Sequence, residues 1–502
     1  RPDGPFQIFA TVVTTQDDAV PVTRAGRDLA EAVRLGAATL REEHSRRIRE
    51  YEARPHARAW SADGKVIFDE VWGGTPYRVR PDGYYGDVAL CSVDSTKFCF
   101  QDSSIWHADF HFNEIEATSA MILRQYDRLD SYFRMIRTLL PMAQANAREV
   151  HACRGAMFPL VHYPLKSDSV VRVNATWEQS MEITAMLARP FWLRYLYTGD
   201  KEFLRKFAWP VLREGARFYA DYLKLESDGR YHVFPTVSPE HRGITKDLKF
   251  NRDSQSGITL ICYHLRAAAR AAEMLGLSPA EAARWRRIAG RMAEYPVIEQ
   301  EAGRIFTDVD GGQPIEYNIP VPLSAVFWGD DIGLDSPPAQ LELARNTLRR
   351  INVWPPHRPY LARVRARLGI PESKDALTAE HFLQSYTGVV RIFPATPPGF
   401  EGEFQNLGAQ GGFVVAARRG RDGVAWVTLN SMAGDSCTVA SPWPGRSVRV
   451  TDAADGKRIR FRESAGRIQF PTRRNHTYRL EVEAAPAPAW RVGSQSVDWR
   501  KN

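Results

Sequence analysis

A helix–turn–helix pattern recurs through the middle of this 502-residue chain and constrains its fold more than any other feature. In each unit, apolar residues recur three and four positions apart, as on one face of an amphipathic helix, and a short turn leads to a second such segment. The series of about ten helices predicts an antiparallel array, and closure into a toroid is favoured over an open solenoid. The predicted helices cover residues 27–51, 114–128, 131–148, 176–197, 200–224, 256–276, 279–294, 337–351 and 375–386.

Two of the predicted turns carry residues that end one helix and begin the next. At Thr198-Gly199-Asp200, the glycine can adopt the left-handed conformation that closes a helix, and the aspartate can cap the helix that follows. At Ser278-Pro279, a capping serine precedes a proline at the first helical position. Both sites therefore predict sharp reversals of the chain.

The sequence pattern changes near residue 387, after which short β-branched segments alternate with turns. Asp422-Gly423 and Asp455-Gly456 are typical of β-hairpins, so this region predicts a β-sandwich. Residues 6–14 (FQIFATVVT) predict a single strand, the end of an N-terminal β-domain that is largely missing. The predicted division is a terminal strand and linker over 1–25, a helical toroid over 26–386, a β-sandwich over 387–482, and a linker and tail over 483–502. Within the toroid, residues 61–105 are expected to contain short strands or surface excursions.

Composition and charge argue against two classes of function. The net charge of +8 comes from arginines scattered over the whole length, without the basic stripe that follows phosphates, so nucleic acid is not an expected partner. No apolar stretch approaches the roughly 18–20 residues that a membrane-spanning helix needs. Among the five cysteines, Cys91 and Cys99 lie close enough for a local disulfide, and five free thiols are an equal alternative.

The densest group of polar residues is WHADFHFNEIE, residues 106–116, immediately before a predicted helix. A helix start needs one or two such residues as caps, so a capping role alone does not account for seven of them. The entrance of a helix in a toroid is also where a catalytic site would lie. The candidates from this segment are Trp106, His107, Asp109, His111, Asn113, Glu114 and Glu116.

Further candidates lie in three shorter segments. Glu240 follows Ser-Pro on a rigid turn that could direct its carboxyl into a cavity, although the same tripeptide is an ordinary helix start. Asp253 fits two roles equally well, the cap of the helix that begins near residue 256 and a contact to a ligand. Residues 308–312 (DVDGG) resemble the start of a calcium loop, but Ile319 stands where its glutamate would be, so a hairpin turn is expected. The sequence has no P-loop, GxGxxG or GxSxG motif, and neither a metal nor a cofactor is predicted.

Three segments together resemble glycoside hydrolase family 95, the inverting α-L-fucosidases and related α-L-galactosidases. They are WHADFHFN (106–113), FWLRYLYTGDKEFLRKFAWPVLREGARFYADYL (191–223) followed by FPTVSPEH (234–241), and GVVRIFPATPPGF (388–400) with GAQGGFVVAARRGRDGVAWVTLNS (408–431). The resemblance extends, with gaps, over roughly residues 5–482. It implies an (α/α)6 barrel between β-domains.

The resemblance implies that Glu240 is the general acid, that Asn113 is the first of a pair of catalytic asparagines, and that His111 binds sugar. The second asparagine of that pair is replaced by Ile115. A histidine-rich element of the family becomes YNIPVPLSAVFWGDD (317–331), and its Asp-Gly-Asn element has no counterpart before residues 379–388. The acid therefore carries over, whereas the base and several sugar contacts do not.

The function predicted from these observations is an exo-acting, inverting glycosidase that removes an α-L-fucose-like or α-L-galactose-like residue from an oligosaccharide or polysaccharide. Inversion needs an acid and a base on opposite faces of the sugar, so we expect Glu114 or Glu116, beside Asn113, to supply the base. Trp106, Asp109, His111, His241 and Asp253 are the expected sugar contacts.

Two alternatives remain open at this point. A polysaccharide lyase with a helical toroid would use His111 and Tyr317 as bases. A catalytically inactive glycan-binding relative would explain the replaced asparagine. The sequence starts at Arg1 without a visible export signal, and the substrate class favours a secreted or periplasmic location.

Overall fold

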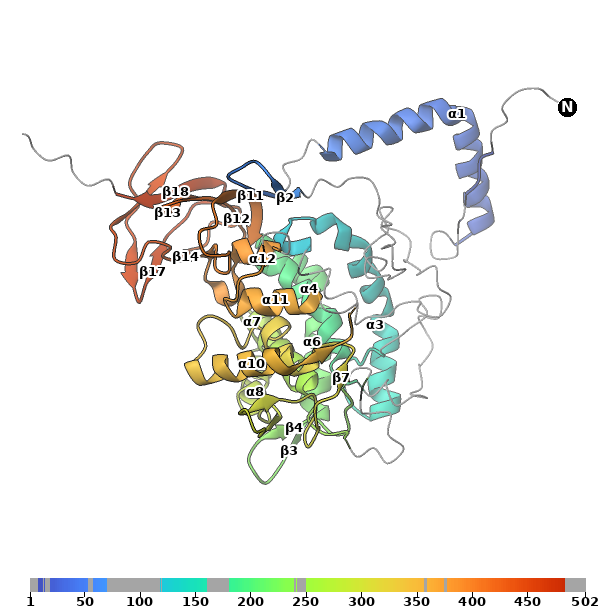
Figure 1. Ribbon diagram of the computed structural model, residues 1–502. Coiled ribbons are helices and arrows are strands. Elements are labelled where there is room, and N and C mark those ends of the chain that lie inside the picture. Colours follow the sequence, from blue (N-terminus) through green and yellow to red (C-terminus); the bar gives the residue numbers. More distant parts are fainter. Residues whose placement is uncertain are drawn as a thin grey trace, which may run out of the picture.

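The structure is a computed structural model that describes residues 8–11, 13, 19–52, 57–69, 118, 120–159, 180–238, 241, 250–355, 359–373 and 377–483. The described chain forms a helical part followed by antiparallel β-sheets (Figure 1). The longer helices of the helical part are α3 (Asp130–His151), α4 (Ile183–Thr198), α6 (Trp209–Tyr222), α7 (Gln255–Leu275), α8 (Pro279–Ala289), α10 (Pro338–Arg350) and α11 (Pro359–Arg367).

The turn between α4 and α6 confirms the prediction made from its sequence. Gly199 closes α4 in the left-handed region with φ 67°, and its N–H donates to the Tyr195 carbonyl. The Asp200 side chain then accepts from the Glu202 and Phe203 N–H groups and starts α5 (Lys201–Phe203). A π-helical turn, η5 (Leu204–Ala208), joins α5 to α6. At the other predicted turn Pro279 is the first helical residue of α8, but Ser278 provides no side-chain cap.

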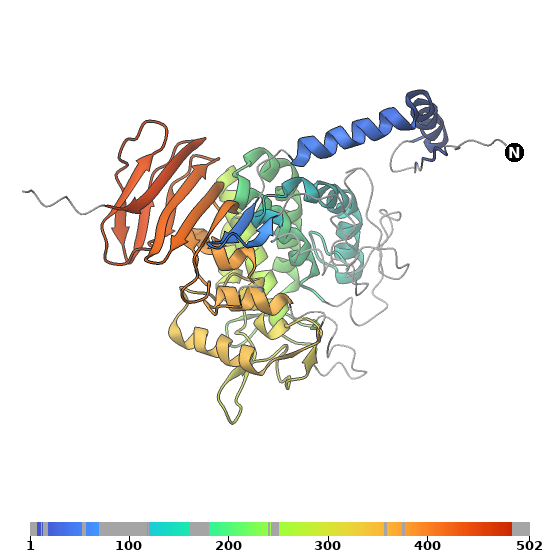
Figure 2. The same cartoon turned by 45° about the horizontal axis from the view of Figure 1, so that its top comes forward.

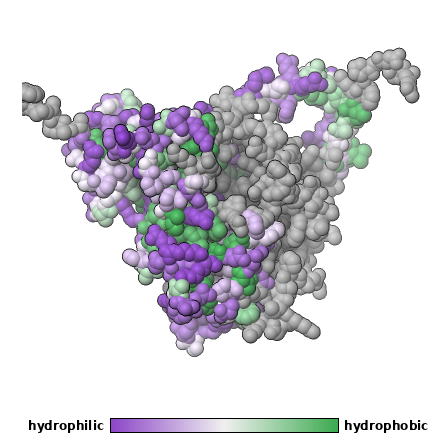
Figure 3. Space-filling view, in the orientation of Figure 1, coloured by the Kyte–Doolittle hydropathy of each residue, from purple (hydrophilic) through white to green (hydrophobic). Residues whose placement is uncertain are grey.

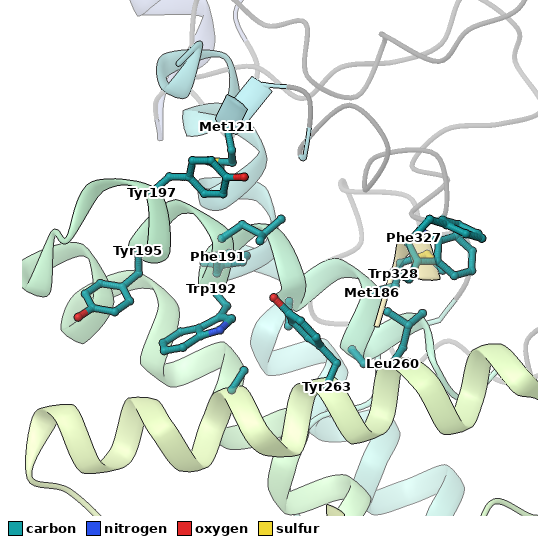
Figure 4. Packing of buried hydrophobic residues seen from close by; sticks show 14 of the residues in the cluster. Met121, Met186, Phe191, Trp192, Tyr195, Tyr197, Leu260, Tyr263, Phe327 and Trp328 are labelled. Atoms are coloured by element: carbon teal, nitrogen blue, oxygen red, sulfur yellow. The ribbon is translucent and has the colours of Figure 1, made fainter. Parts of the chain in front are cut away.

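Large aromatic side chains fill the space between the helices. Phe191 and Trp192 of α4 and Tyr263 of α7 lie together in the core (Figure 4). Trp328, which follows α9 (Ser324–Phe327), is fully buried and packs on Phe327 with ring centroids 4.6 Å apart. Helix α7 packs against both α4 and α9, and these aromatic side chains fill the interior at the density typical of protein cores.

The C-terminal part contains a seven-stranded and a three-stranded antiparallel sheet. Asp422 and Gly423 form the predicted hairpin between β12 and β13, with Gly420 paired to Gly423. Phe470 of the smaller sheet packs against Tyr478 of the larger one, with ring centroids 5.5 Å apart. The strands are β11 (Gly402–Ala409), β12 (Phe413–Gly420), β13 (Gly423–Ser431), β15 (Val448–Asp452) and β18 (His476–Val482) in the larger sheet, and β14 (Cys437–Ala440), β16 (Arg462–Ser464) and β17 (Arg467–Phe470) in the smaller one.

Two strands from near the N-terminus complete the larger sheet. β1 (Arg58–Ser61) pairs with β11, and β2 (Val66–Asp69) pairs with β1 (Figure 2). Short strands were predicted within residues 61–105, but not their membership of the C-terminal sheet. The predicted β-sandwich of residues 387–482 is therefore extended by a hairpin more than 300 residues away in sequence, which covers the edge of β11.

Helix α1 (Pro21–Glu52) corrects the prediction that residues 27–51 join the helical array. The helix forms, with a break at Gly36, but it stands away from the helical part in both views (Figures 1 and 2), and none of its described side chains is buried. Val22 and Val33 remain 84% and 58% exposed. An amphipathic sequence determines that a helix can form but not what it packs against.

Three other local predictions are corrected by the structure. Residues 8–11 and 13 form no strand. The helix predicted over 114–128 is broken at Arg124, which has φ 62° and lies in the left-handed region. The helix predicted over 375–386 shortens to α12 (Ala379–Phe382). It is followed by β9 (Leu383–Gln384), which pairs with β10 (Arg391–Ile392).

Residues 308–312 form a turn, but not the predicted hairpin. The preceding β6 (Ile305–Phe306) pairs with β5 (Val297–Ile298), whereas the following β7 (Glu316–Tyr317) pairs in parallel with β8 (Asn352–Val353). The turn therefore connects two separate pairs of short strands.

A buried network of charged side chains joins the helices around α11. Arg367 donates to both Glu380 carboxylate oxygens at 2.7 and 3.1 Å and to Asp330 at 2.5 Å. Arg189 of α4 reaches Asp330 at 3.4 Å and donates to the Thr118 hydroxyl at 2.9 Å. Burial would raise the pKa of Glu380, but the neighbouring arginines outweigh it and lower that pKa, so the carboxylate is charged.

The surface around the network contains both hydrophobic and polar regions. In the space-filling view, hydrophobic residues gather around α11, between the polar surfaces of the sheets above and of α10 below (Figure 3). The network itself lines a small cavity whose wall includes Thr118, Tyr197 and Gln410. Through Gln410, which follows β11, this cavity adjoins both the helical part and the sheet.

We predict that Arg367→Met strongly destabilises the fold. The substitution leaves Glu380 and Asp330 buried without their shared guanidinium, and removing one partner of a buried ion pair costs about 3–5 kcal/mol. Thermal unfolding should show the loss as a fall of several degrees in Tm. Lys206→Ala is the matched control, because Lys206 and Glu202 form a surface pair with side chains 65% and 73% exposed. The network would not be a major source of stability if both variants melted alike.

Candidate active site

Most of the predicted catalytic and sugar-binding residues lie outside the described part of the chain. These are Trp106, Asp109, His111, Asn113, Glu114, Glu116 and Glu240. Two predicted contacts, His241 and Asp253, are described, and so are Ser238 and the segments around it. The candidate site is therefore built from the residues that flank these positions.

His241 is held by two neighbouring segments. Its Nε2 accepts a hydrogen bond of 2.8 Å from the Asn318 backbone N–H, and its Nδ1 lies 3.4 Å from the Ser238 hydroxyl. Its ring also meets the Tyr317 ring edge to face, with centroids 5.2 Å apart. Because Nε2 acts as an acceptor, Nδ1 carries the proton of the neutral imidazole. The chain is thus fixed on both sides of position 240.

The segment before Ser238 is anchored to the start of α7. The Thr236 N–H donates to the Asn251 carbonyl at 2.7 Å, and the Thr236 hydroxyl lies 3.4 Å from that of Ser254. Ser254 caps α7 by accepting from the Gly257 N–H. The Gln255 N–H in turn donates to the Asp308 carbonyl at 2.8 Å. Residues 236–238 and 241, 251–257 and 308–318 consequently form one hydrogen-bonded wall.

Asp253 has a structural position that argues against the predicted sugar contact. Its side chain is buried, and both oxygens are engaged: Oδ2 with His232 Nδ1 at 2.6 Å, and Oδ1 with the Val233 N–H at 2.8 Å. Asp253 is not the cap of α7 either, because Ser254 takes that place. The aspartate instead holds the strand β4 (Tyr231–His232) beside the helix start.

His232 lies between two carboxylates. Its Nε2 is 3.0 Å from Asp228, and its Nδ1 is 2.6 Å from Asp253. Burial would lower the pKa of His232, but the hydrogen bonds to Asp253 and Asp228 outweigh burial and raise it. Folding therefore favours protonation of His232 relative to the unfolded chain.

Glu182 is a buried carboxylate that the sequence analysis did not single out. It directly precedes α4, is fully buried, and accepts a 2.8 Å hydrogen bond from the Ser256 hydroxyl in the first turn of α7. It therefore joins the starts of two central helices next to the hydrogen-bonded wall. The only signal in the sequence is an acidic residue just before an apolar helix, which is also what the helix dipole favours.

The described residues offer no evidence for a metal site. Within them, no group of three or more histidine, cysteine, aspartate or glutamate side chains could hold a metal ion. Cys153, Cys262 and Cys437 are free thiols. Among the helices of the described chain, none is long and apolar enough to cross a membrane.

Tyr317, the alternative base of a lyase, is not placed for that role. Its side chain is buried, its ring packs on His241, and its hydroxyl lies 3.4 Å from Asp308. It belongs to the support of the candidate site.

Comparison with known families identifies the class of the protein. The profile described as "Glycosyl hydrolase family 95 catalytic domain" matches residues 101–350, and "Glycoside hydrolase family 95, C-terminal domain" matches residues 384–480. The chain belongs to glycoside hydrolase family 95. The catalytic profile contains the whole hydrogen-bonded wall and Glu182.

Curated relatives match shorter parts of the chain. A kojibiose hydrolase of Flavobacterium johnsoniae is 26% identical over 207 residues, which are 41% of this chain and 28% of the relative. Alpha-L-fucosidase 2 of Arabidopsis thaliana is 33% identical over 108 residues, 21% of this chain and 13% of the relative. Each alignment thus spans less than a third of the relative. Among solved structures, a putative kojibiose phosphorylase from the human microbiome aligns at 11% identity and a TM-score of 0.47, over 90% of this chain and 65% of that one.

We predict that the contribution of His232 to stability depends on pH. Because its pKa is raised on folding, its contribution is fully present below the unfolded value near 6.5 and is lost as pH rises through the folded value. The stability difference between wild type and His232→Gln should therefore be greatest at about pH 5.5, roughly 1.5–3 kcal/mol for charge-assisted hydrogen bonds, and should shrink by pH 8.5. Thermal unfolding at both pH values measures it.

His264 provides a control of opposite sign. It is fully buried, and burial lowers its pKa to about 4. The unfolded chain therefore binds a proton that the folded chain does not as pH falls below about 6.5, and the wild type loses stability there. The difference between wild type and His264→Gln should become smaller at low pH. Equal pH dependence in the two variants would contradict both assignments.

Proposed function

We propose that the protein is an exo-acting, inverting glycosidase that removes an α-L-fucose-like or α-L-galactose-like residue from a glycan. The observation that carries this proposal is the fixed position of Ser238 and His241 on either side of Glu240, within a region that matches the family's catalytic domain. We also propose that the helical part from α3 to α12 closes as an (α/α)6 toroid and that residues 387–482, extended by β1 and β2, form its companion β-sandwich. This range is narrower than the predicted 26–386 because α1 stands apart and β1 and β2 join the larger sheet.

In the proposed mechanism, Glu240 is the general acid. Its proton passes to the glycosidic oxygen as the bond from that oxygen to the anomeric carbon breaks, and a carboxylate on the opposite face takes a proton from the attacking water. The new bond joins the water oxygen to the anomeric carbon and inverts its configuration. Such an acid and base are typically about 6.5–9.5 Å apart, which leaves room for the water.

The base is proposed to come from the segment beside Asn113. Glu114 and Glu116 are the first candidates, and only one can point inward because neighbouring helical positions face different directions. Glu182 is a further candidate, favoured by its burial at the start of α4 and its contact with Ser256.

Trp106, Asp109 and His111 are proposed as direct sugar contacts. His241 is proposed to position the segment next to Glu240 rather than to contact the sugar, because both of its ring nitrogens face protein groups. Asp253 is not proposed as a sugar contact, because its two carboxylate oxygens already bond to His232 and to the Val233 N–H.

A second substrate is suggested by the names of the relatives. Kojibiose hydrolases from two bacteria match 41% of this chain, whereas the plant fucosidase matches 21%. An α-linked glucose disaccharide is therefore a candidate substrate beside α-L-fucosides. A glycan-binding relative without catalysis is the second candidate function, favoured by Ile115 in place of the second asparagine. The lyase alternative loses support because the Tyr317 hydroxyl faces Asp308 inside the protein.

We predict that Glu240→Gln lowers the hydrolysis rate of a natural glycan by about 10²–10⁴, the usual value of general acid catalysis. The loss should be much smaller on an activated aryl glycoside, whose leaving group needs no proton. Loss of the base should instead reduce the rates on both substrates alike. The base is identified by assaying Asp109→Ala, Glu114→Gln, Glu116→Gln and Glu182→Gln on fucosyllactose, kojibiose and aryl glycosides.

Glu214→Gln is a suitable control, because Glu214 is a buried glutamate of α6 that pairs with Arg213 and Arg217. This variant should leave unchanged the ratio of the hydrolysis rate on the natural glycan to that on the aryl glycoside. If Glu240→Gln affected both substrates equally, Glu240 would not be the acid. If the wild type hydrolysed none of the substrates while binding them, the glycan-binding alternative would replace the glycosidase.

A further inference from the structure

A partly exposed tryptophan lies between two arginines on the outer face of the larger sheet. Trp426 of β13 is directly opposite Arg418 of β12 in the register of the two strands. The neighbouring pair, Val427 and Ala417, is fully buried. Because successive side chains of a strand alternate between its two faces, Trp426 and Arg418 point away from the core. Figure 2, in which the top of Figure 1 comes forward, shows this side of the sheet facing the viewer.

The second arginine, Arg479 of β18, is held in place by two contacts. Its guanidinium lies over the Trp426 ring, 5.5 Å from the ring centroid, and its Nε donates to the Glu481 carboxylate at 2.8 Å. Arg449 of β15 donates to the other oxygen of that carboxylate. Within the described chain, the two terminal nitrogens of Arg479 donate no hydrogen bond, and Arg418 forms no ion pair. Both guanidinium groups beside the indole therefore have N–H groups available for a ligand.

This arrangement places cationic donors next to an apolar ring. A guanidinium binds a carboxylate or a sulfate through two parallel N–H groups. Arg479 is already stacked and hydrogen-bonded, so it loses less conformational freedom when it binds such a group. The exposed part of the indole provides apolar surface for the C–H side of a pyranose, which would remove that surface from water. A sugar that carries an acid group matches both features.

The charge of the C-terminal part favours an anionic partner. Residues 387–483 contain 14 arginines and lysines but nine aspartates and glutamates. Beside Trp426, Glu481 is shared by two arginines, so positive charge remains uncompensated there.

One carboxylate in the same row indicates which kind of anion is preferred. Glu403 of β11 is directly opposite Arg418 on the side away from Trp426, and it accepts from the Gln405 amide at 2.9 Å. A carboxylate at this position can accept hydrogen bonds from sugar hydroxyls, but it repels a chain that has a phosphate at every residue. The row therefore suits an acidic glycan better than a nucleic acid.

We infer that this face binds an acidic polysaccharide, with the C–H side of one sugar on Trp426 and its carboxylate or sulfate on Arg418 and Arg479. The face contains no residue of the candidate active site, so the inference goes beyond the proposed glycosidase and does not depend on it. A polysaccharide held here would raise the local concentration of glycan chains around the protein.

Biolayer interferometry of the whole chain on immobilised polygalacturonate, dextran sulfate and neutral dextran tests this inference. At about 0.15 M salt, where charges are screened beyond about 8 Å, the wild type should bind an acidic polysaccharide and not dextran. The two acidic surfaces distinguish a carboxylate ligand from a sulfate ligand. Trp426→Ala and Arg479→Gln should each weaken binding about tenfold. Arg479→Lys should also bind more weakly than the wild type, because an ammonium group has neither the stacking plane nor the fork of a guanidinium.

Arg462→Gln is the charge-matched control, since Arg462 is exposed on β16 of the smaller sheet and forms no ion pair with any described residue. It should bind like the wild type. An equal loss in Arg462→Gln and Arg479→Gln overturns the inference, and so does equal binding to dextran or no binding to either acidic polysaccharide. Tighter binding of a single-stranded oligonucleotide also overturns it and assigns the face to nucleic acid. Because the measurement involves no hydrolysis, failure of the proposed glycosidase activity leaves its outcome unchanged.

Discussion

Arg367 enters the interior of the helical part with its charge intact, and the surrounding structure is arranged to neutralise it. The Glu380 carboxylate accepts from Nε and Nη2 of Arg367, and Asp330 accepts from Nη1. Arg189 extends the network to Thr118. A charge in this environment is tolerated only when every partner is in place, so the network requires α4, α11, α12 and the segment after α9 to meet in one geometry. The core aromatics add stability without the same directionality.

The candidate active site is held together by hydrogen bonds rather than by the Arg367 ion-pair network. Its wall is built mostly from backbone groups: the Gln255 N–H on the Asp308 carbonyl, the Thr236 N–H on the Asn251 carbonyl, and the Asn318 N–H on His241. These hydrogen bonds hold Thr236, His241, Gln255 and Asp308 in one arrangement. Such a rigid scaffold beneath loops is a general feature of catalytic sites.

Much of the fold was predictable because the signals are local. The Gly199-Asp200 turn, the proline at the start of α8 and the Asp422-Gly423 hairpin follow from the φ preference of glycine or proline and from side-chain capping, all within a few residues. The failures involve distant parts of the chain. The pairing of β1 with β11 and the separation of α1 from the helical part depend on which surfaces are available, and the pattern of a single segment does not record that.

The sequence by itself determined that a helical part precedes antiparallel strands and where the Gly199-Asp200 and Asp422-Gly423 turns lie, and it singled out 106–116 and Ser-Pro-Glu as candidates, because these depend on spacing and residue type. Only the tertiary structure decided that Asp253 is engaged by His232, that Glu182 meets Ser256, and that Arg479 lies over the Trp426 ring. These partners are 21, 74 and 53 residues apart in sequence. The role of a carboxylate or an indole depends on burial and hydrogen-bond partners, and both are properties of the packed molecule.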